Sequence, residues 1–228
     1  MKPRIAILAS GEGTTAEAFI RACSRDEVDA EVGLVICNRE AAGIFQRIEN
    51  LNLELGLTVQ TMLLNSQTHP AADGEVVERG YQTTAEEAAI LDVLTKRNFD
   101  LILLMGYLRR VGSSIVQAFG WRPEYSSPYR AIMLNSHPGL LPETTGTYGI
   151  HTQEATLDQK LAYSGQTLHV VSENYDEGPV LAVHKVAVLP NDTAESLFGR
   201  VQTVEKQNLP IDVAAFMKAR RQYILESK

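Results

Sequence analysis

The sequence has only two cysteines, Cys23 and Cys37, among its 228 residues. Two cysteines cannot build a disulfide framework, and their spacing matches no metal-binding or redox motif. We therefore expect both to be buried or partly buried thiols, in a protein of a reducing compartment.

Long hydrophobic runs are also missing. The apolar run near the amino end, residues 5–9, is too short for the core of a signal peptide and runs directly into a glycine-rich loop. No stretch approaches the roughly 18 apolar residues that a membrane-spanning helix needs. We expect a cytoplasmic protein with no membrane partner.

Positive charge is in short supply, since 21 Lys and Arg stand against 28 Asp and Glu, for a formal net charge of −7. Binding to DNA or RNA depends on many Lys and Arg contacts, so we expect small molecules rather than nucleic acid as partners. Hydrophobic residues make up 44% of the chain and charged residues 21%, which excludes a disordered chain, a collagen-like fibre and a coiled coil. The length fits one large domain, residues 1–228.

Short apolar runs alternate with helical patterns along the chain. Strands are expected at 4–9, 31–37, 57–63, 100–105, 131–134, 167–171 and 180–189, and helices at 16–23, 41–51, 84–96 and 194–220, the last with a break near Pro210. Residues 65–80 and 120–129 are expected to be surface loops. Strands that are apolar throughout and alternate with helices indicate an α/β fold, with a doubly wound, mostly parallel sheet and helices on both faces.

A glycine-rich loop, SGEGTT at residues 10–15, joins the first expected strand to the first expected helix. Glycines let the backbone approach an anion, and the free N–H groups and dipole of the helix start favour negative charge. A dinucleotide fingerprint would need a third glycine where Ala16 stands, and an acidic residue where Asn38 and Arg39 stand. A single phosphate therefore fits better than a nicotinamide dinucleotide, and a plain turn with no ligand stays open.

The stretch LNSHPGLLP at residues 134–142 contains the first candidates for chemistry, Asn135 and His137. They lie two apart at the end of an expected strand, so both side chains should face the same side. Asn offers an NH₂ donor for a developing oxyanion, and His offers a proton donor and acceptor near neutral pH. A structural histidine is the alternative.

An acidic loop, SENYDEGP at residues 172–179, follows a later expected strand. Its Asp176 could reach His137, raise its pKa or orient its ring. The neighbouring Glu173 and Glu177 are expected to be solvated.

In chain order these segments resemble the folate-dependent phosphoribosylglycinamide formyltransferases, over about residues 4–216. The matching parts are SGEGTT, GYLR at 106–109, NSHPGLLP at 135–142, YDEGP at 175–179 and RVQTVE at 200–205. The specific part is the Asn-x-His-Pro-x-Leu-Leu-Pro strand end followed by the Asp-x-Gly-Pro loop. The resemblance implies the Rossmann-like formyltransferase fold, with a substrate-binding half at 1–105 and a folate-binding and catalytic half at 106–228.

The resemblance also implies an activity, the transfer of a formyl group from 10-formyltetrahydrofolate to the amine of glycinamide ribonucleotide in de novo purine biosynthesis. This one-carbon transfer needs no metal. Asn135 and a protonated His137 would stabilise the oxyanion of the tetrahedral intermediate, and Asp176 would hold His137. These three are the expected catalytic residues.

The same resemblance assigns the binding residues. The substrate phosphate would lie on the glycine-rich loop, the ribose hydroxyls on a late acidic residue, and the folate along the segment after the fourth strand. The implied substrate-binding residues are Gly11, Glu12, Gly13, Thr14, Thr15 and Glu205, the folate-binding residues are Leu108, Arg109, Arg110 and Val111, and His151 is a possible site-lining residue.

Some positions depart from the family pattern. Thr14-Thr15 replaces the usual Ser-Asn, Glu143 stands where Lys or Arg is usual, and Arg110 stands where an apolar residue is usual. These departures leave open a related formyltransferase for another phosphorylated or sugar-nucleotide amine, and a non-catalytic folate- or nucleotide-binding homologue. A formyltetrahydrofolate deformylase is disfavoured because the first strand is expected at Arg4, with no room for a preceding domain. Monomer and homodimer are both open.

Overall fold

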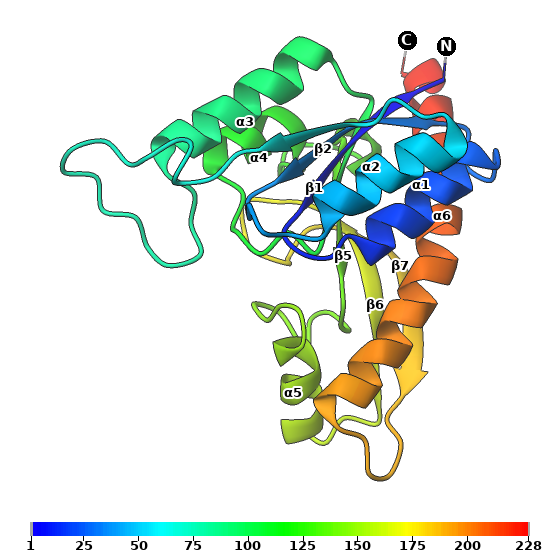
Figure 1. The fold of residues 1–228 in the computed structure, drawn as a ribbon. Coiled ribbons are helices and arrows are strands. Elements are labelled where there is room, and N and C mark those ends of the chain that lie inside the picture. Colours follow the sequence, from blue (N-terminus) through cyan, green and yellow to red (C-terminus); the bar gives the residue numbers. More distant parts are fainter. Residues whose placement is uncertain (1, 228) are drawn as a thin grey trace.

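The computed structural model describes residues 2–227, which form alternating strands and helices (Figure 1). The elements are β1 (Arg4–Ala9), α1 (Thr14–Ser24), β2 (Glu31–Cys37), α2 (Ile44–Leu55), β3 (Gln60–Leu63), α3 (Thr84–Arg97), β4 (Leu101–Met105), α4 (Ser113–Phe119), the 3-10 helix η1 (Pro128–Arg130), β5 (Met133–His137), α5 (His151–Asp158), β6 (Tyr163–Val170), β7 (Val180–Ala187) and α6 (Ala194–Glu226).

The strands form one seven-stranded sheet in the order β3-β2-β1-β4-β5-β6-β7. Strands β1 to β5 pair in parallel, whereas β5 with β6 and β6 with β7 pair antiparallel. The expected α/β fold with a doubly wound, mostly parallel sheet is therefore confirmed.

Side-chain alternation along the central strands builds a separate core on each face of the sheet. Ile5 and Ile7 of β1 pack in the core under α1, α2 and α6, whereas Ala6 and Leu8 pack in the core under α3 and α4. Successive strand residues point to opposite faces, so a strand covered on both sides must be apolar throughout. Figure 1 shows these two helical layers on either side of the sheet.

Helix α6 corrects one expectation, because it runs without a break from Ala194 to Glu226 through Pro210. A proline removes one intrahelical hydrogen bond and disfavours a helix interior. Here Pro210 and its neighbours Leu209 and Val213 are buried, and the helix packs along α1, β6 and β7. This burial outweighs the local cost.

Other elements differ from the expectation at their ends or were not expected at all. Helix α2 begins at Ile44 and β3 at Gln60, later than expected, while α4 and α5 were not expected. The segment 65–80 forms the loop that projects beside the start of α3 (Figure 1). Both cysteines are free and buried, as expected.

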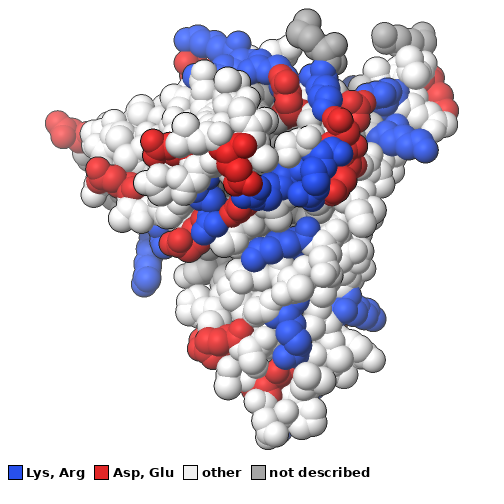
Figure 2. All heavy atoms as spheres, turned by 45° about the vertical axis from the view of Figure 1, so that its right-hand side comes forward, with Lys and Arg blue, Asp and Glu red and all other residues white. Residues whose placement is uncertain are grey.

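The surface carries charges of both signs. On the face in Figure 2, acidic and basic side chains interleave over the upper part of the molecule, and the lower part is mostly uncharged. Ion pairs such as Arg21 with Glu54 and Arg47 with Glu17 join α1 and α2. Within residues 2–227, every helix is too short or too polar to cross a membrane.

Candidate active site

The site begins where β1 and β4 end side by side in the sheet. The chain after β1 turns towards α1 and the chain after β4 turns towards the opposite face, which leaves a crevice of the kind that binds ligands in such sheets. Ser10 fixes this junction, since its backbone N–H donates to the Gly106 carbonyl at 3.1 Å and its hydroxyl accepts from Leu108 N–H at 2.8 Å. The same hydroxyl lies 2.5 Å from Asn38 Oδ1.

A cavity of about 240 Å³ opens at this crevice. Its wall combines the glycine-rich loop, the end of β4, the end of β5, the turn before α5 and one face of α6. Among the residues expected in the site, it is lined by Gly11, Glu12, Gly13, Thr14, Thr15, Leu108, Asn135, His137 and Glu205. The structure therefore brings the expected phosphate loop and two of the three expected catalytic residues to one cavity.

The glycine-rich loop needs glycine at Gly13. This residue has a φ of +71°, and a Cβ there would lie 2.5 Å from Ile44 Cγ1. Gly13 also precedes the first turn of α1, whose first N–H groups have no intrahelical acceptor. The loop thus presents backbone donors to the cavity.

Strand β5 carries Asn135 and His137 on one side, as their spacing predicted. His137 is buried, and its Nε2 lies 2.9 Å from Thr144 Oγ1. The Thr144 hydroxyl donates to the Leu140 carbonyl at 2.8 Å, so its oxygen accepts the proton on His137 Nε2. In the neutral ring, Nδ1 is then the nitrogen that can take up a proton.

The third expected catalytic residue, Asp176, comes from the loop after β6. Its Oδ2 lies 3.6 Å from His137 Nδ1 and accepts from Gly146 N–H at 3.2 Å, and its Oδ1 accepts from Asn135 Nδ2 at 3.5 Å. Its φ is +59°. Two residues on, a Cβ at Gly178 would lie 1.7 Å from the Val170 carbonyl oxygen, so only glycine fits there.

The electrostatics of His137 combine two opposing effects. Burial lowers the pKa of His137 to about 4, although the nearby Asp176 carboxylate opposes that shift. The expected effect of Asp176 on the pKa of His137 is therefore present but outweighed by burial, and His137 is neutral at pH 7. Desolvation prevails because removing an imidazolium from water costs more free energy than its attraction to one carboxylate at this distance recovers.

Sequence reasoning missed His169, which completes this cluster. His169 is buried on β6, directly opposite Asn135 in the β5–β6 pairing. Its Nε2 lies 3.0 Å from Asn135 Nδ2 and 3.5 Å from Asp176 Oδ1, and its Nδ1 lies 3.1 Å from the Val170 carbonyl. The signal in the sequence was a histidine among the apolar residues Leu168, Val170 and Val171 of the expected strand.

The opposite side of β5 faces α6. Ser136 donates to Glu205 Oε1 at 2.5 Å, and Thr15 donates to Glu205 Oε2 at 3.1 Å. Burial raises the pKa of Glu205, and these two hydrogen bonds oppose that shift. The Thr15 hydroxyl, expected to hold a phosphate, is therefore directed to Glu205 instead.

The segment expected to hold folate borders the cavity described above and a smaller one, and its Leu108 and Arg109 also border a wider open hollow beside residues 77–83. Leu108 lines the larger one, whereas Arg109, Arg110 and Val111 line a smaller cavity of about 40 Å³. Asn135, Tyr107 and Tyr175 line both, and Asp176 and His169 line the smaller one. Asn135 is thus the expected catalytic residue that faces both cavities.

The structure does not bring His151 into this site. His151 is exposed at the start of α5, pairs with Glu154 at 2.7 Å and lines neither cavity. Glu143 is exposed, and Arg110 donates to the Tyr81 hydroxyl and the Glu173 carbonyl, each at 3.0 Å. Two of the family departures thus lie at the surface or on the rim of the small cavity.

Known proteins resemble this chain over most of its length. It is 31% identical to a chloroplastic phosphoribosylglycinamide formyltransferase of Arabidopsis thaliana over 88% of the chain, and 27% identical to a phosphoribosylglycinamide formyltransferase of Bacillus subtilis over 91% of both chains. The chain spans 60% of the length of that chloroplastic relative and 58% of the length of one from Vigna unguiculata.

Solved structures share the fold. A glycinamide ribonucleotide transformylase 1 from Symbiobacterium toebii superposes with a TM-score of 0.76 at 29% identity, covering 96% of this chain and 89% of that one. A phosphoribosylglycinamide formyltransferase from Bacillus halodurans gives 0.74 at 29% identity, covering 95% and 94%. The formyl transferase family model matches residues 3–213, and the chain therefore belongs to the formyl transferase family.

Proposed function

We propose that this chain transfers the formyl group of 10-formyltetrahydrofolate to the amine of glycinamide ribonucleotide. The observation that carries the proposal is the convergence of Asn135, His137 and Asp176 beside a cavity that also contains the glycine-rich loop. A protein that only binds its ligands has no need of a carboxylate that lies beside both an amide donor and an imidazole. The names of the relatives agree with this reaction.

The reaction forms one bond and breaks another. The substrate amine attacks the formyl carbon, and a tetrahedral intermediate with a negative oxygen results. Collapse of this intermediate breaks the bond to N10 of the folate, which takes a proton, and leaves the formyl group on the amine. The protein must therefore stabilise the oxyanion and move a proton from the amine to N10.

Asn135 supplies the oxyanion donor, because its side-chain amide lies where the two cavities meet. The neutral His137 accepts the proton that the amine loses, at Nδ1. Asp176, 3.6 Å from that nitrogen, stabilises the imidazolium formed. This proposed role differs from the expected one, in which His137 is protonated from the start, and the pKa of about 4 supports it.

The two substrates occupy different parts of the site. We assign the phosphate to the backbone donors of residues 11–15 and the ribose hydroxyls to Glu205, whose carboxylate lies in the wall of the larger cavity. We assign the folate to Leu108, Arg109, Arg110 and Val111. On this assignment, residues 1–228 act as one domain, with substrate contacts mainly from 1–105 and folate contacts mainly from 106–228. We further propose that the protein acts in the cytoplasm, as a monomer or homodimer.

The proposal is tested by following the absorbance of a 10-formyl folate in the presence and absence of glycinamide ribonucleotide. Amine-dependent loss of the formyl group supports the proposed reaction. Loss without the amine would identify a deformylase, and folate binding without any loss would identify either another amine or a non-catalytic homologue. Inorganic phosphate should compete with the amine substrate, and a lack of competition would remove the phosphate role of residues 11–15.

A further inference from the structure

A buried carboxylate outside both cavities is left without an explanation by the proposed reaction. Glu86, in the first turn of α3, has no exposed side-chain surface. Neither of its carboxyl oxygens accepts a hydrogen bond from any group in residues 2–227. Taking a carboxylate out of water costs several kcal/mol unless a charge or hydrogen bonds compensate. Glu86 also lines neither cavity, so it is not placed to touch a substrate.

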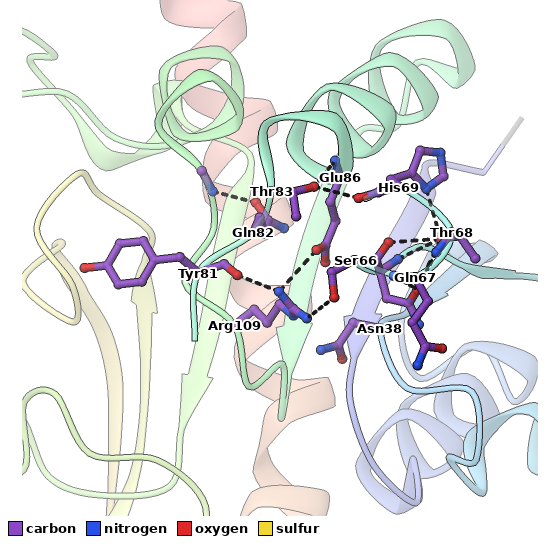
Figure 3. Close-up of polar contacts among 12 residues, drawn as sticks. Asn38, Ser66, Gln67, Thr68, His69, Tyr81, Gln82, Thr83, Glu86 and Arg109 are labelled. Carbon is purple, nitrogen blue, oxygen red and sulfur yellow. Dashed lines mark hydrogen bonds and ion pairs between the residues drawn. The ribbon is translucent and has the colours of Figure 1, made fainter. Parts of the chain in front are cut away.

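The group that compensates Glu86 is Arg109, one of the residues assigned to folate. Arg109 Nη1 lies 3.2 Å from Glu86 Oε2, and only 20% of the Arg109 side chain is exposed. Burial raises the pKa of Glu86 and the Arg109 charge opposes that shift. The ion pair joins helix α3 to the segment that follows β4 (Figure 3).

Arg109 is held by further contacts from the same side. Nη1 donates to the Tyr81 carbonyl at 2.5 Å, and Nη2 donates to the Ser66 hydroxyl at 3.2 Å. Figure 3 shows the guanidinium between these groups and the Glu86 carboxylate. Its planar fork is therefore fixed from several directions, which a flexible ammonium would not allow.

The neighbours of Arg109 are attached to the same stretch, residues 80–86. Gln82 donates to the Tyr107 hydroxyl at 2.9 Å and accepts from Gly112 N–H at 2.8 Å. Arg110 N–H donates to the Gly80 carbonyl at 2.8 Å. Segment 80–86 thus braces segment 107–112 from Tyr107 to Gly112.

Segment 107–112 supplies one wall to each cavity. Tyr107 and Leu108 line the larger cavity, and Arg109 to Val111 line the smaller one beside Asn135 and Asp176. Any shift of Arg109 along the sheet would therefore move the wall assigned to the folate. The glycine-rich loop and Glu205, assigned to the amine substrate, have no contact with Glu86 in this network.

We infer that Glu86 is a positioning residue for the formyl donor: through Arg109 it fixes segment 107–112 in the form that binds folate. The inference rests on the proposed function, because it names the substrate that this segment receives. It requires that the loss of the Glu86 charge weaken folate binding while leaving the amine site intact.

The direct test is Glu86→Gln, which keeps the shape of the side chain and removes its charge. We expect the Kd and KM for the 10-formyl folate to rise about tenfold, since hydrogen bonds and contacts to a charged group are the strong ones. The KM for the amine and kcat at saturating folate should stay within about twofold. A merely structural role would instead reduce the active fraction, and so kcat, without changing the folate Kd.

The matched control is Asp92→Asn on the same helix. The Asp92 carboxylate pairs with Lys96 at the exposed surface.

A double variant guards against misfolding. Glu86→Leu with Arg109→Met replaces the buried pair by apolar groups, an exchange that often leaves stability unchanged or improved. We expect this variant to fold and still bind folate at least about tenfold more weakly. Folding with an unchanged folate Kd would overturn the inference.

Hydrogen exchange separates this inference from the proposed function, because it needs no ligand. Without Glu86, the amides of Arg110 and Gly112 should exchange faster, since both donate to the 80–86 segment. Unchanged exchange at these amides in Glu86→Gln would overturn the positioning role. A parent chain that binds no 10-formyl folate would overturn the proposed function instead.

Discussion

The Nδ2 atom of Asn135 lies 3.0 Å from Nε2 of His169, across the antiparallel pairing of β5 and β6. His169 Nδ1 faces the Val170 carbonyl at 3.1 Å, which places the ring proton on Nδ1 and leaves Nε2 to accept from the amide. His169 therefore sets the orientation of Asn135. The amide donates one proton to His169 and directs the other towards Asp176 Oδ1 at 3.5 Å, so this second, longer contact is the one that an oxyanion would replace.

We expect His169→Leu to lower kcat, because the Asn135 amide loses the acceptor that orients it. A misdirected donor in an oxyanion site typically costs about tenfold to a hundredfold. The KM of the amine should change less, since His169 does not line the larger cavity. Steady-state kinetics with both substrates checks this, and a kcat within twofold of the parent would show that Asn135 needs no such support.

Removing the amide itself should have the larger effect. Asn135→Ala is expected to lower kcat by about 10²–10³, the usual cost of losing one oxyanion donor. Asn174→Ala is the control, because Asn174 is exposed on the same loop as Asp176 and its side chain donates to Glu177. Equal activity losses in the two variants would contradict an oxyanion role for Asn135.

The low pKa of His137 predicts a pH dependence of stability. In the unfolded chain the pKa of a histidine is about 6.5, and in the fold it is lowered to about 4. The unfolded state therefore binds more protons between these values, so stability is complete above about pH 6.5 and falls as the pH drops towards 4. The loss from this group is about 3 kcal/mol. Urea unfolding of the parent and of His137→Gln across this pH range isolates the contribution of His137. If the free energy of unfolding depends on pH in the same way in both proteins, the lowered pKa of His137 is refuted.

Glycine at position 178 is expected to be required for the Asp176 loop. A Cβ there would meet the Val170 carbonyl at 1.7 Å, so Gly178→Ala must displace the loop. We expect a loss of stability of about 1–3 kcal/mol and a lower kcat. Gly199→Ala is the matched control, since that helical glycine has open space around it and should gain about 0.5–1 kcal/mol. Thermal unfolding and kinetics of the two variants decide the point.

The Ser136–Glu205 contact predicts a selective effect on the amine substrate. Ser136→Ala removes the donor at 2.5 Å from Glu205 Oε1, so the burial that raises the pKa of Glu205 is less opposed. We expect the KM of the amine to rise about tenfold and that of the formyl donor to stay constant. Thr203 has an exposed hydroxyl on α6, the helix that carries Glu205, and Thr203→Ala should change neither KM. A rise in both KM values would argue for a general disturbance of β5.

Local patterns predicted the central sheet well. Strands β1 and β2 match their expected bounds because their apolar runs are bounded by polar residues or glycine. The period of a strand also placed Asn135 and His137 on one side. Helix α5 escaped prediction because its buried residues, Thr152, Gln153 and Thr156, are polar and give no hydrophobic period.

Features that depend on distant partners could not be predicted in the same way. His169 joins the site only through the register of an antiparallel pair, and the Glu86–Arg109 ion pair joins residues of different elements. The continuity of α6 through Pro210 reflects packing that no local rule contains. The neutral state of His137 likewise follows from burial rather than from its neighbour Asp176.

The hydrogen bond between Thr15 and Glu205 joins residues that are 190 positions apart. One wall of the larger cavity comes from the loop after β1, and the wall that touches it comes from α6. During translation the glycine-rich loop therefore stays without this partner until α6 has left the ribosome and docked on the sheet. A nascent chain that stops before Glu205 has no complete substrate site.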